Sequence, residues 1–502
     1  MKTIRNYIYL LLVLGLVSSC DKDVLEVSST TQISAETFWK TESDAKLGID
    51  GVYNRLQSYA SNYLYTDAVA DNAYSNYPWE GFKAIADGTH DARGPGSIDW
   101  FWDDFWKGIG RANTLLDNID AVEMDEAIKT RMKGEALFLR AYFYFQLTDF
   151  YGGVPLILEA PKLEHGALPR NTKEAVVDQI IVDLNAAAGM LETTASETGR
   201  ATEGAAIALK AKVLLFNNRN AEAAVAANEV MGMGYSLFPS YRDLFKEENE
   251  NNEEVIFDAQ FKSPEVGNFY ELYIGADGGG GWASIMPLPE LVADYDMVDG
   301  LPTSTSPLYD PANPYENRDP RLKQTLFVPG STYNNGVPLN DLNTYTGFAF
   351  KKYTEYDEDT NVTPTGYPTT TGLNVIILRY AEILLIYAEA QNEAVGPDAS
   401  VYAALKELRS RPSVMMPDIP AGLSQAQMRE VIRHERRVEL AMEGKRYSDV
   451  RRWGIAEDVM NGIVDPGGTR TFNPSRDYLW PIPGKQFDLP DNTLEQNPNY
   501  GE

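Results

Sequence analysis

The chain has 502 residues, of which 43% are hydrophobic and 23% charged, so it can bury a large core and is not generally disordered. Lys and Arg number 44 against 73 Asp and Glu, and the net charge of -29 repels phosphate backbones and excludes nucleic acid as a partner. The single cysteine excludes an intrachain disulfide, and three scattered histidines argue against a His/Cys zinc site. Aromatic residues reach 11%, which is a first indication of a stacking surface.

The amino-terminus is typical of an export signal. Lys2 and Arg5 precede an apolar run at 7–17, far shorter than the roughly 20 residues that a membrane span needs. Cys20 closes the string V-S-S-C, which resembles a bacterial lipobox, where the cysteine is acylated and becomes the first residue of the mature protein. The alternative is a plain signal peptide with an incidental cysteine. We predict a signal peptide over 1–19, a lipid anchor on Cys20 and a tether over 20–37.

The mature chain is more acidic than its precursor. The signal peptide carries two of the basic residues and no acidic one, so its removal changes the net charge from -29 to -31. Asp21, Lys22 and Asp23 follow the cysteine directly and resemble the acidic export signal of surface lipoproteins, although a polar tether would have a similar composition.

Helical periodicity dominates the chain outside its middle. The run at 135–150 is so apolar that we expect protein on nearly all sides of it, and Gly152 and Gly153 should end it. A helix start is expected at Asn171, with Glu174 in the capping-box position. The predicted helices cover 44–56, 105–119, 135–150, 171–191, 202–216, 221–231, 375–394, 400–409 and 424–443.

The segment 257–373 lacks this periodicity and is dense in Gly, Pro, Asn, Asp and Thr. Aromatic runs at 255–257 and 348–350 predict short strands. The tetraglycine at 278–281 is followed by no Lys-Ser/Thr pair, so it predicts a hinge or tight loop beside a binding surface rather than a phosphate loop. Asp294, Asp296 and Asp299 do not have EF-hand spacing. The sequence therefore assigns no cofactor or metal, and leaves only a structural calcium ion open.

Two carboxylates, Glu439 and Glu443, lie four residues apart on one helix face among six Arg and Lys side chains between 436 and 452. Two close carboxylates could serve as the acid and base of a glycoside hydrolase. However, neighbouring guanidinium groups keep carboxylates ionised, whereas a general acid needs a raised pKa. We therefore interpret the pair as part of a structural ion-pair network and predict no catalytic residue.

The aromatic residues divide into two groups. Those on periodic helices, such as Trp106 and Phe143, are expected in the core. Others lie in polar or Gly-rich segments, where a ring either plugs a loop or marks an interaction site. A sugar can stack its C–H face on such a ring while polar side chains bind its hydroxyls. The candidate ligand-binding residues are Asn72, Tyr74, Tyr77, Trp79, Arg93, Trp100, Tyr273, Trp282 and Tyr295.

Long strings follow one another along the chain, among them ETFWKTESDAKLGIDGVYNRL (36–56), GEALFLRAYFYFQLTDFYGGVPLI (134–157), RRVELAMEGKRYSDVRRWG (436–454) and LWPIPGKQFDLPDNTLEQNPNY (479–500). Together they resemble the SusD/RagB family of Bacteroidetes outer-membrane lipoproteins and keep the order of its motifs. The resemblance is weakest near 60–100 and 260–370, where the candidate binding residues lie.

The resemblance implies a mainly α fold in which TPR-like paired helices form an α/α superhelical body with a large, loop-rich variable insertion that contains short strands. We expect an N-terminal helical part over 38–256, a variable ligand-binding part over 257–373, and C-terminal helices with a Pro-rich tail over 374–502.

The family also implies a role. It predicts a non-enzymatic lipoprotein on the outer membrane at the cell surface, which captures a glycan and delivers it to a TonB-dependent, SusC-like transporter for import. A peptide-binding protein like RagB is the alternative, and a surface glycoside hydrolase is a weaker one.

Overall fold

The computed structural model describes residues 38–357 and 370–501. The predicted signal peptide, Cys20 and the tether lie outside these ranges. Within them, no helix combines the length and the apolar character that crossing a membrane requires.

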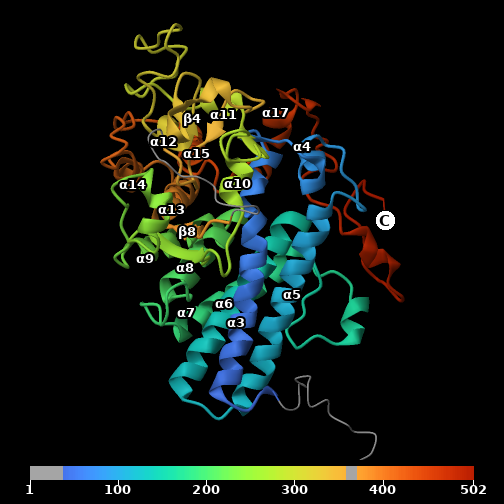
Figure 1. Ribbon diagram of the computed structural model, residues 1–502. Coiled ribbons are helices and arrows are strands. Elements are labelled where there is room, and N and C mark those ends of the chain that lie inside the picture. Colours follow the sequence, from blue (N-terminus) through green and yellow to red (C-terminus); the bar gives the residue numbers. More distant parts are fainter. Residues whose placement is uncertain (1–37, 358–369, 502) are drawn as a thin grey trace, which may run out of the picture.

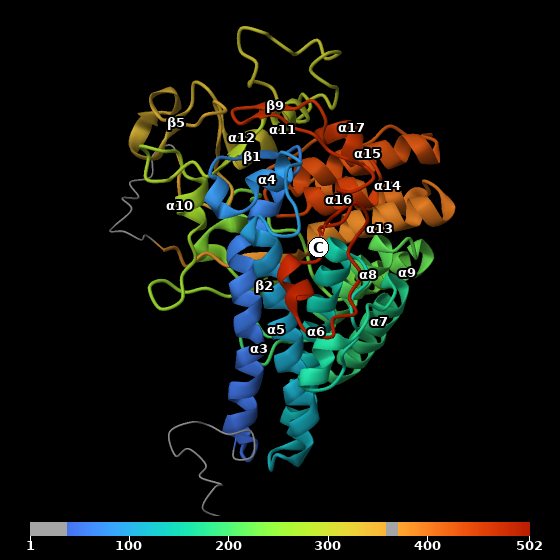
Figure 2. The ribbon, with the colours of Figure 1, turned by 90° about the vertical axis from the view of Figure 1, so that its right-hand side faces the viewer.

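Long helices form the body of the molecule, and Figures 1 and 2 show α3, α5 and α6 running side by side with α7, α8 and α9 stacked next to them. This half comprises α3 (Glu42–Tyr63), α5 (Gly96–Asn118), α6 (Glu126–Tyr151), α7 (Lys173–Met190), α8 (Glu203–Phe216) and α9 (Asn220–Met231). The helices near the carboxyl end are α13 (Tyr380–Val395), α14 (Ala399–Arg409), α15 (Gln425–Glu439), α16 (Arg446–Arg452) and α17 (Ala456–Met460).

Local sequence sets where these helices begin and end. Thr41 and Asp44 form a capping box at the start of α3. Gly152 ends α6 with a φ of 79°, as the sequence predicts. The expected cap of α7 is off by one residue, because the hydroxyl of Thr172 accepts from the backbone N–H of Ala175, while the side chain of Asn171 accepts from Leu156 instead.

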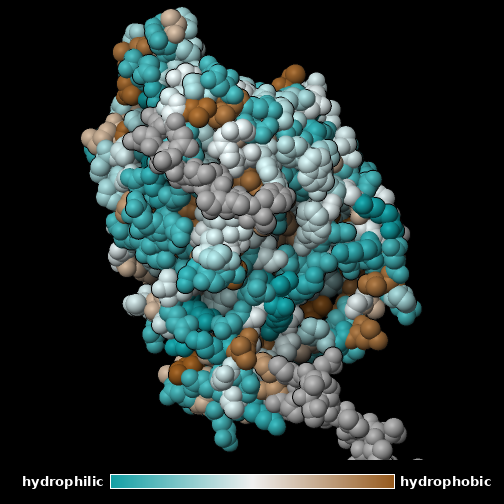
Figure 3. Space-filling view, viewed as in Figure 1, coloured by the Kyte–Doolittle hydropathy of each residue, from teal (hydrophilic) through white to brown (hydrophobic). Residues whose placement is uncertain are grey.

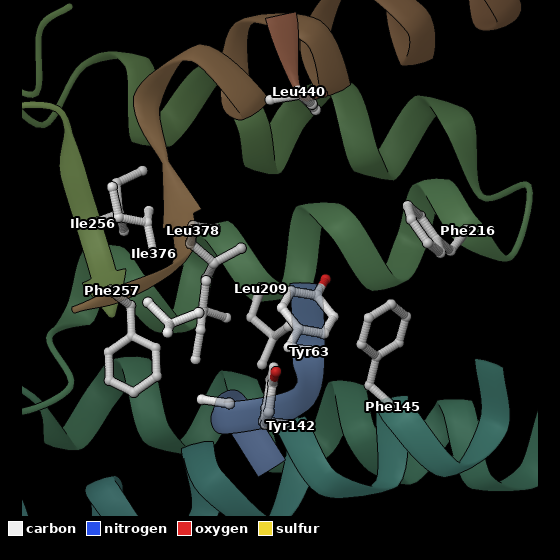
Figure 4. Packing of buried hydrophobic residues seen from close by; sticks show 14 of the residues in the cluster. Tyr63, Tyr142, Phe145, Leu209, Phe216, Ile256, Phe257, Ile376, Leu378 and Leu440 are labelled. Carbon is white, nitrogen blue, oxygen red and sulfur yellow. The ribbon is translucent and has the colours of Figure 1, made fainter. Parts of the chain in front are cut away.

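The core lies between α6, α8 and a strand pair, and α6 is buried on nearly all sides as its composition predicts. Figure 4 shows this packing, with labelled side chains from α3, α6, α8 and both strands pointing toward one another. The residues are Tyr63, Tyr142, Phe145, Leu209, Phe216, Ile256, Phe257, Ile376, Leu378 and Leu440.

The predicted helix over 375–394 is wrong in its first five residues. Val375–Arg379 form the strand β8, which pairs antiparallel with β2 (Val255–Ala259), and α13 begins only afterwards. The run of Val and Ile there suits a buried strand, and a short apolar run does not distinguish a strand from a helix by periodicity. The helix α15 also ends at Glu439 rather than 443, before a turn in which Gly444 has a φ of 68°.

The loop-rich part carries only short elements, and the strands predicted at 255–257 and 348–350 are confirmed as β2 and β7. Apart from the β2–β8 pair, whose strands have five residues, the strands have two or three residues each. The short helices of the molecule are α4 (Lys83–Ala86), α10 (Tyr270–Ile274), α11 (Pro289–Ala293) and α12 (Arg321–Thr325). The remaining strands are β1 (Ala73–Ser75), β3 (Ile285–Pro287), β4 (Leu326–Phe327), β5 (Thr332–Tyr333), β6 (Val337–Pro338), β7 (Ala349–Phe350), β9 (Val464–Asp465) and β10 (Gly468–Thr469).

A buried ion-pair network joins the loop-rich part to the C-terminal helices. Arg379 donates to Glu254 at 2.7 Å, to Glu439 at 2.8 Å and to Glu443 at 2.6 Å. Arg411 bridges Glu254 and Glu439 at 2.6 and 3.0 Å. These five side chains are almost completely excluded from solvent.

Two further cations complete the network. Arg321 contacts Glu439 at 2.9 Å, and Lys352 contacts Glu443 at 2.6 Å. Burial opposes the ionisation of Glu439, but the surrounding arginines outweigh it and hold the pKa of Glu439 well below its usual range. The interpretation as a structural network is confirmed, although these four cations come from other parts of the chain and not from the neighbours at 436–452.

Replacement of one carboxylate should show how strongly the fold depends on this network. We expect Glu439→Gln to lower the free energy of unfolding by about 3–5 kcal/mol, because it leaves buried arginines without their counter-charge. Denaturant unfolding measures the loss. The control is Asp418→Asn, which breaks an exposed pair with Lys406 and should cost about 1 kcal/mol or less. Equal, small losses in both variants would contradict the role assigned to Glu439.

Candidate functional site

A short strand pair brings together two aromatic segments that lie about 200 residues apart in the sequence. β1 pairs antiparallel with β3, with Ser75 opposite Ile285. Just beyond this pair, the backbone N–H of Asn76 donates to the carbonyl of Ser284 at 2.9 Å. The hydroxyl of Tyr77 then donates to the carbonyl of Trp282 at 3.1 Å. The two segments are therefore fixed side by side by backbone and side-chain bonds.

The rings of these two segments and of Tyr345, from a separate loop beside Tyr77, form a surface that we call the aromatic platform. It consists of Tyr77, Trp79, Tyr273, Trp282 and Tyr345. Tyr77 and Trp79 stack with centroids 4.4 Å apart and planes inclined by 21°. Tyr273 and Trp282 lie 6.0 Å apart and are both half-buried. Burial and the adjacent Tyr345 raise the pKa of Tyr77.

Two rings of the platform are exposed to solvent. Trp79, in the one-turn helix η3 (Pro78–Glu80), is 71% exposed although it stacks against Tyr77. Tyr345 is 46% exposed. The face of the molecule shown in Figure 3 is mostly hydrophilic with small, separate hydrophobic patches, so broad apolar exposure is not a general property of that face. Rigid exposed rings are suited to stacking against a ligand.

Polar groups and a tight glycine loop border the platform. The amide of Asn343 donates to the carboxylate of Asp277 at 3.4 Å, and the Asn343 side chain is exposed. The loop 278–281 follows Asp277 and leads into Trp282. A Cβ atom on Gly281 would lie 2.1 Å from the carbonyl oxygen of Gly275, so only glycine permits this close approach. The predicted tight loop is present.

Four of the nine candidate residues, Tyr77, Trp79, Tyr273 and Trp282, come together in the platform. Three others are buried, and the structure corrects the expectation that they face a ligand. Tyr74 packs inward from β1 against Met286 and Leu288, Asn72 accepts from Arg437 at 3.0 Å, and Tyr295 is fully buried. Because these three side chains are buried, they stabilise the fold and cannot contact a ligand at the surface.

The last two candidates are exposed but contribute no described contact to the platform. Arg93 forms a bidentate salt bridge with Asp488, with N–O distances of 2.9 and 3.1 Å. Trp100 lies on α5 and covers Gly96. Sequence reasoning missed Tyr345, which has a φ of 49°. A tyrosine in the Thr344–Gly347 turn is the signal that could have indicated it.

A well-formed cavity lies elsewhere among the described residues. It measures about 730 Å³, is open on one side, and is lined mainly by α3, α5 and the segment 155–168. Its walls include Trp102, Trp106 and Pro161, and they are mainly apolar. Its walls also carry polar side chains, among them Asp103, Lys107 and Arg111. Its aromatic rings, however, are buried or half-buried, whereas Trp79 and Tyr345 of the platform are exposed. We therefore treat the platform, rather than the cavity, as the candidate site.

The described residues contain no group of three or more His, Cys, Asp and Glu side chains arranged to hold a metal ion. The acidic run singled out in the sequence is used structurally. Asp294 pairs with Arg437, and Asp299 accepts from Ser306 and from the backbone of Leu301.

Comparison with known proteins identifies the scaffold around this site. Residues 243–500 match a family model described as the SusD family. The chain belongs to the SusD family. Residues 23–215 match a second model of this type, described as "Starch-binding associating with outer membrane". A SusD-like protein of Formosa agariphila is 28% identical to the chain, with 99% of each protein covered.

Solved SusD-like structures confirm the mainly helical fold class. A SusD-like protein of Bacteroides fragilis is 30% identical and superimposes with a TM-score of 0.81, covering 93% of this chain and 98% of that one. A laminarin-binding SusD-like protein is 28% identical, has a TM-score of 0.75, and covers 92% of this chain and 100% of its own.

The glycine loop provides a direct test of the site geometry in this SusD-family protein. We expect Gly281→Ala to cost about 1–3 kcal/mol of stability, because its methyl group would overlap the backbone of Gly275. Thermal unfolding measures the change. The control is Gly166→Ala, where nothing lies within 4 Å of the added carbon. If the two variants unfold at the same temperature, the loop is not packed as described.

Proposed function

We propose that this SusD-family protein binds carbohydrate at the cell surface through the aromatic platform, without cleaving it. The observation that carries the proposal is the stack of the exposed Trp79 on Tyr77, which the β1–β3 pair places beside Trp282. The starch-binding description of the second family model and the laminarin-binding relative support carbohydrate as the ligand class.

The chemistry of the platform suits a sugar polymer. The apolar C–H face of each sugar ring would lie on an exposed indole or phenol ring, and by analogy with base stacking each contact would contribute about 1–3 kcal/mol. Asp277 and Asn343 at the border offer acceptors and donors for hydroxyl groups. Because the platform is an open surface, it can bind an internal stretch of a long chain.

The proposal of binding without hydrolysis is supported by the state of the two carboxylates that first suggested catalysis. Glu439 and Glu443 are buried, and their arginine partners outweigh the effect of burial and lower both pKa values. A glycoside hydrolase needs one carboxylic acid that is protonated and reaches the glycosidic oxygen. Neither residue can meet the substrate in this arrangement.

We further propose that the protein is held at the outer membrane by a lipid on Cys20 and delivers its ligand to a TonB-dependent, SusC-like transporter. The lipobox-like string V-S-S-C and the short apolar run before it support the anchor. The family model whose description names association with the outer membrane supports the location. Transfer to the transporter follows from the family resemblance.

Affinity electrophoresis against a panel of polysaccharides tests the binding proposal. At least one glycan should retard the protein, and Trp79→Ala or Trp282→Ala should weaken that binding about tenfold, which corresponds to about 1.4 kcal/mol for one lost stacking contact. Leu163→Ala removes another highly exposed apolar side chain and serves as the control.

Three outcomes would contradict this account. Retardation by no glycan would argue against carbohydrate binding, and displacement of the glycan by oligopeptides would favour the peptide-binding alternative. Sustained release of reducing ends from the bound glycan would identify a hydrolase.

The anchor and the transporter can be tested in one set of cells. In a Bacteroidetes host, the wild-type protein should incorporate an alkyne-labelled fatty acid, fractionate with the outer membrane and co-purify with a TonB-dependent transporter. Cys20→Ser should lose the label and leave the membrane fraction. Label and membrane association that survive this substitution would exclude Cys20 as the anchor.

A further inference from the structure

Behind the exposed face of the platform lies a buried carboxyl group. Glu80 ends η3 and directly follows Trp79. Its two carboxyl oxygens are inaccessible to water and make no hydrogen bond of regular geometry with the described residues. The hydroxyls that lie against this carboxyl belong to Ser284 and Tyr65, and both are likewise buried and without a regular hydrogen bond.

These two neighbours support the other half of the platform. Ser284 follows Trp282 by two residues, and its backbone N–H donates to the carbonyl of Tyr273 at 2.7 Å. The ring of Tyr65, in the short 3₁₀-helix η2 (Leu64–Val69), contacts that of Tyr273 with centroids 5.2 Å apart. Glu80 therefore lies where the segment that carries Trp79 meets the segment that carries Trp282.

None of the described cations compensates a negative charge at this position. On α4, Lys83 pairs with Asp87 at 3.3 Å. On η2, the other titratable group is the buried Asp67. From α5, the uncharged hydroxyl of Ser97 donates to the carbonyl of Gly81. The titratable side chains on the platform side are Tyr77, Tyr273, Asp277 and Tyr345, none of them a cation.

The environment accordingly favours the neutral carboxyl. Burial raises the pKa of Glu80 to about 7, although Ser284 and Tyr65 oppose the shift. Burial also raises the pKa values of Tyr65 and Tyr77, so both phenols stay neutral at pH 6–8.5. Between pH 6 and pH 8.5, Glu80 therefore changes from the neutral to the ionised form, next to Trp79 in the sequence.

We propose that Glu80 is the positioning residue of the aromatic platform, and that its neutral carboxyl group holds Trp79 and Trp282 in the arrangement that binds ligand. The inference rests on the proposed carbohydrate-binding function. A neutral carboxyl can donate an O–H hydrogen bond to the hydroxyl of Ser284 or Tyr65 and so join the two segments. An ionised carboxylate there is a buried charge without a counter-ion, which η3 can relieve only by moving toward water.

The sign of the pH effect follows from proton linkage. A ligand that binds the arrangement held by the neutral carboxyl stabilises that form of Glu80, so the complex holds the proton more tightly than the free protein. Affinity is therefore high below the pKa of Glu80 and falls as the pH rises through it. For each unit by which the ligand raises this pKa, affinity changes about tenfold.

Calorimetric titration at pH 6 and pH 8.5, with the polysaccharide that most retards the wild-type protein, tests the role of Glu80. We expect the wild type to bind about tenfold more weakly at pH 8.5, which corresponds to a one-unit shift on binding. Glu80→Gln, which is neutral at both values, should keep the low-pH affinity throughout. Glu250→Gln is the matched control, because burial raises the pKa of Glu250 to about 7 and it contacts Asn374 rather than the platform. It should retain the wild-type pH dependence.

A measurement on the free protein separates this inference from the proposed function. Tryptophan emission should change with a midpoint near pH 7 in the wild type. The transition should be absent from Glu80→Gln and from Trp79→Phe. A transition or an affinity loss that persists in Glu80→Gln would overturn the role of Glu80, as would a wild type whose affinity and emission are both independent of pH. Failure of the wild type to bind any glycan at pH 6 would overturn the proposed function instead, while the emission experiment would still decide whether Glu80 positions Trp79.

Discussion

The fold depends on the requirement that every charge around Arg379 in the interior has a partner. Arg379 reaches Glu254, Glu439 and Glu443, so three segments of the chain meet here: that of Arg379 itself, that of Glu254, and the end of α15 with the turn after it. A buried arginine that loses a carboxylate keeps the full cost of its lost hydration, so these segments are stable only together. The network therefore sets how the helical body and the loop-rich part are placed relative to each other.

The helix α15, which ends at Glu439, connects this ion-pair network to the candidate site. Two residues before the end of α15, Arg437 donates to the side chain of Asn72 and to the carbonyl of Asp71, just before β1. Arg470 donates to the carbonyl of Ala73 at 2.8 Å. The strand β1, which leads to Tyr77 and Trp79, is thus fixed to the interior by buried guanidinium groups. A rigid support lets the platform keep rings exposed without collapsing onto the core, and Asn72 serves the site in this indirect way.

Much of the helical body could be predicted from sequence because its signals are local. The apolar run before Gly152 and the hydroxyl at Thr202 each indicate a helix boundary within a few residues. The partners of Glu439 could not be predicted, since Arg321 and Arg379 lie far away in the sequence. The exposure of the aromatic residues could not be predicted either, because Tyr74 and Trp79 occur in the same polar segment. Only the pairing of β1 with β3 turns Tyr74 inward and leaves Trp79 outside. The platform was therefore predicted as a group of residues and not as a geometry.

The most direct test of this account is a crystal structure of the protein with a bound oligosaccharide taken from the glycan that it retains best. The account predicts a sugar ring stacked on Trp79, with the chain continuing toward Trp282 and its hydroxyls within hydrogen-bonding distance of Asp277 or Asn343. A sugar bound instead in the cavity of about 730 Å³ between α3 and α5, with the platform empty, would contradict it.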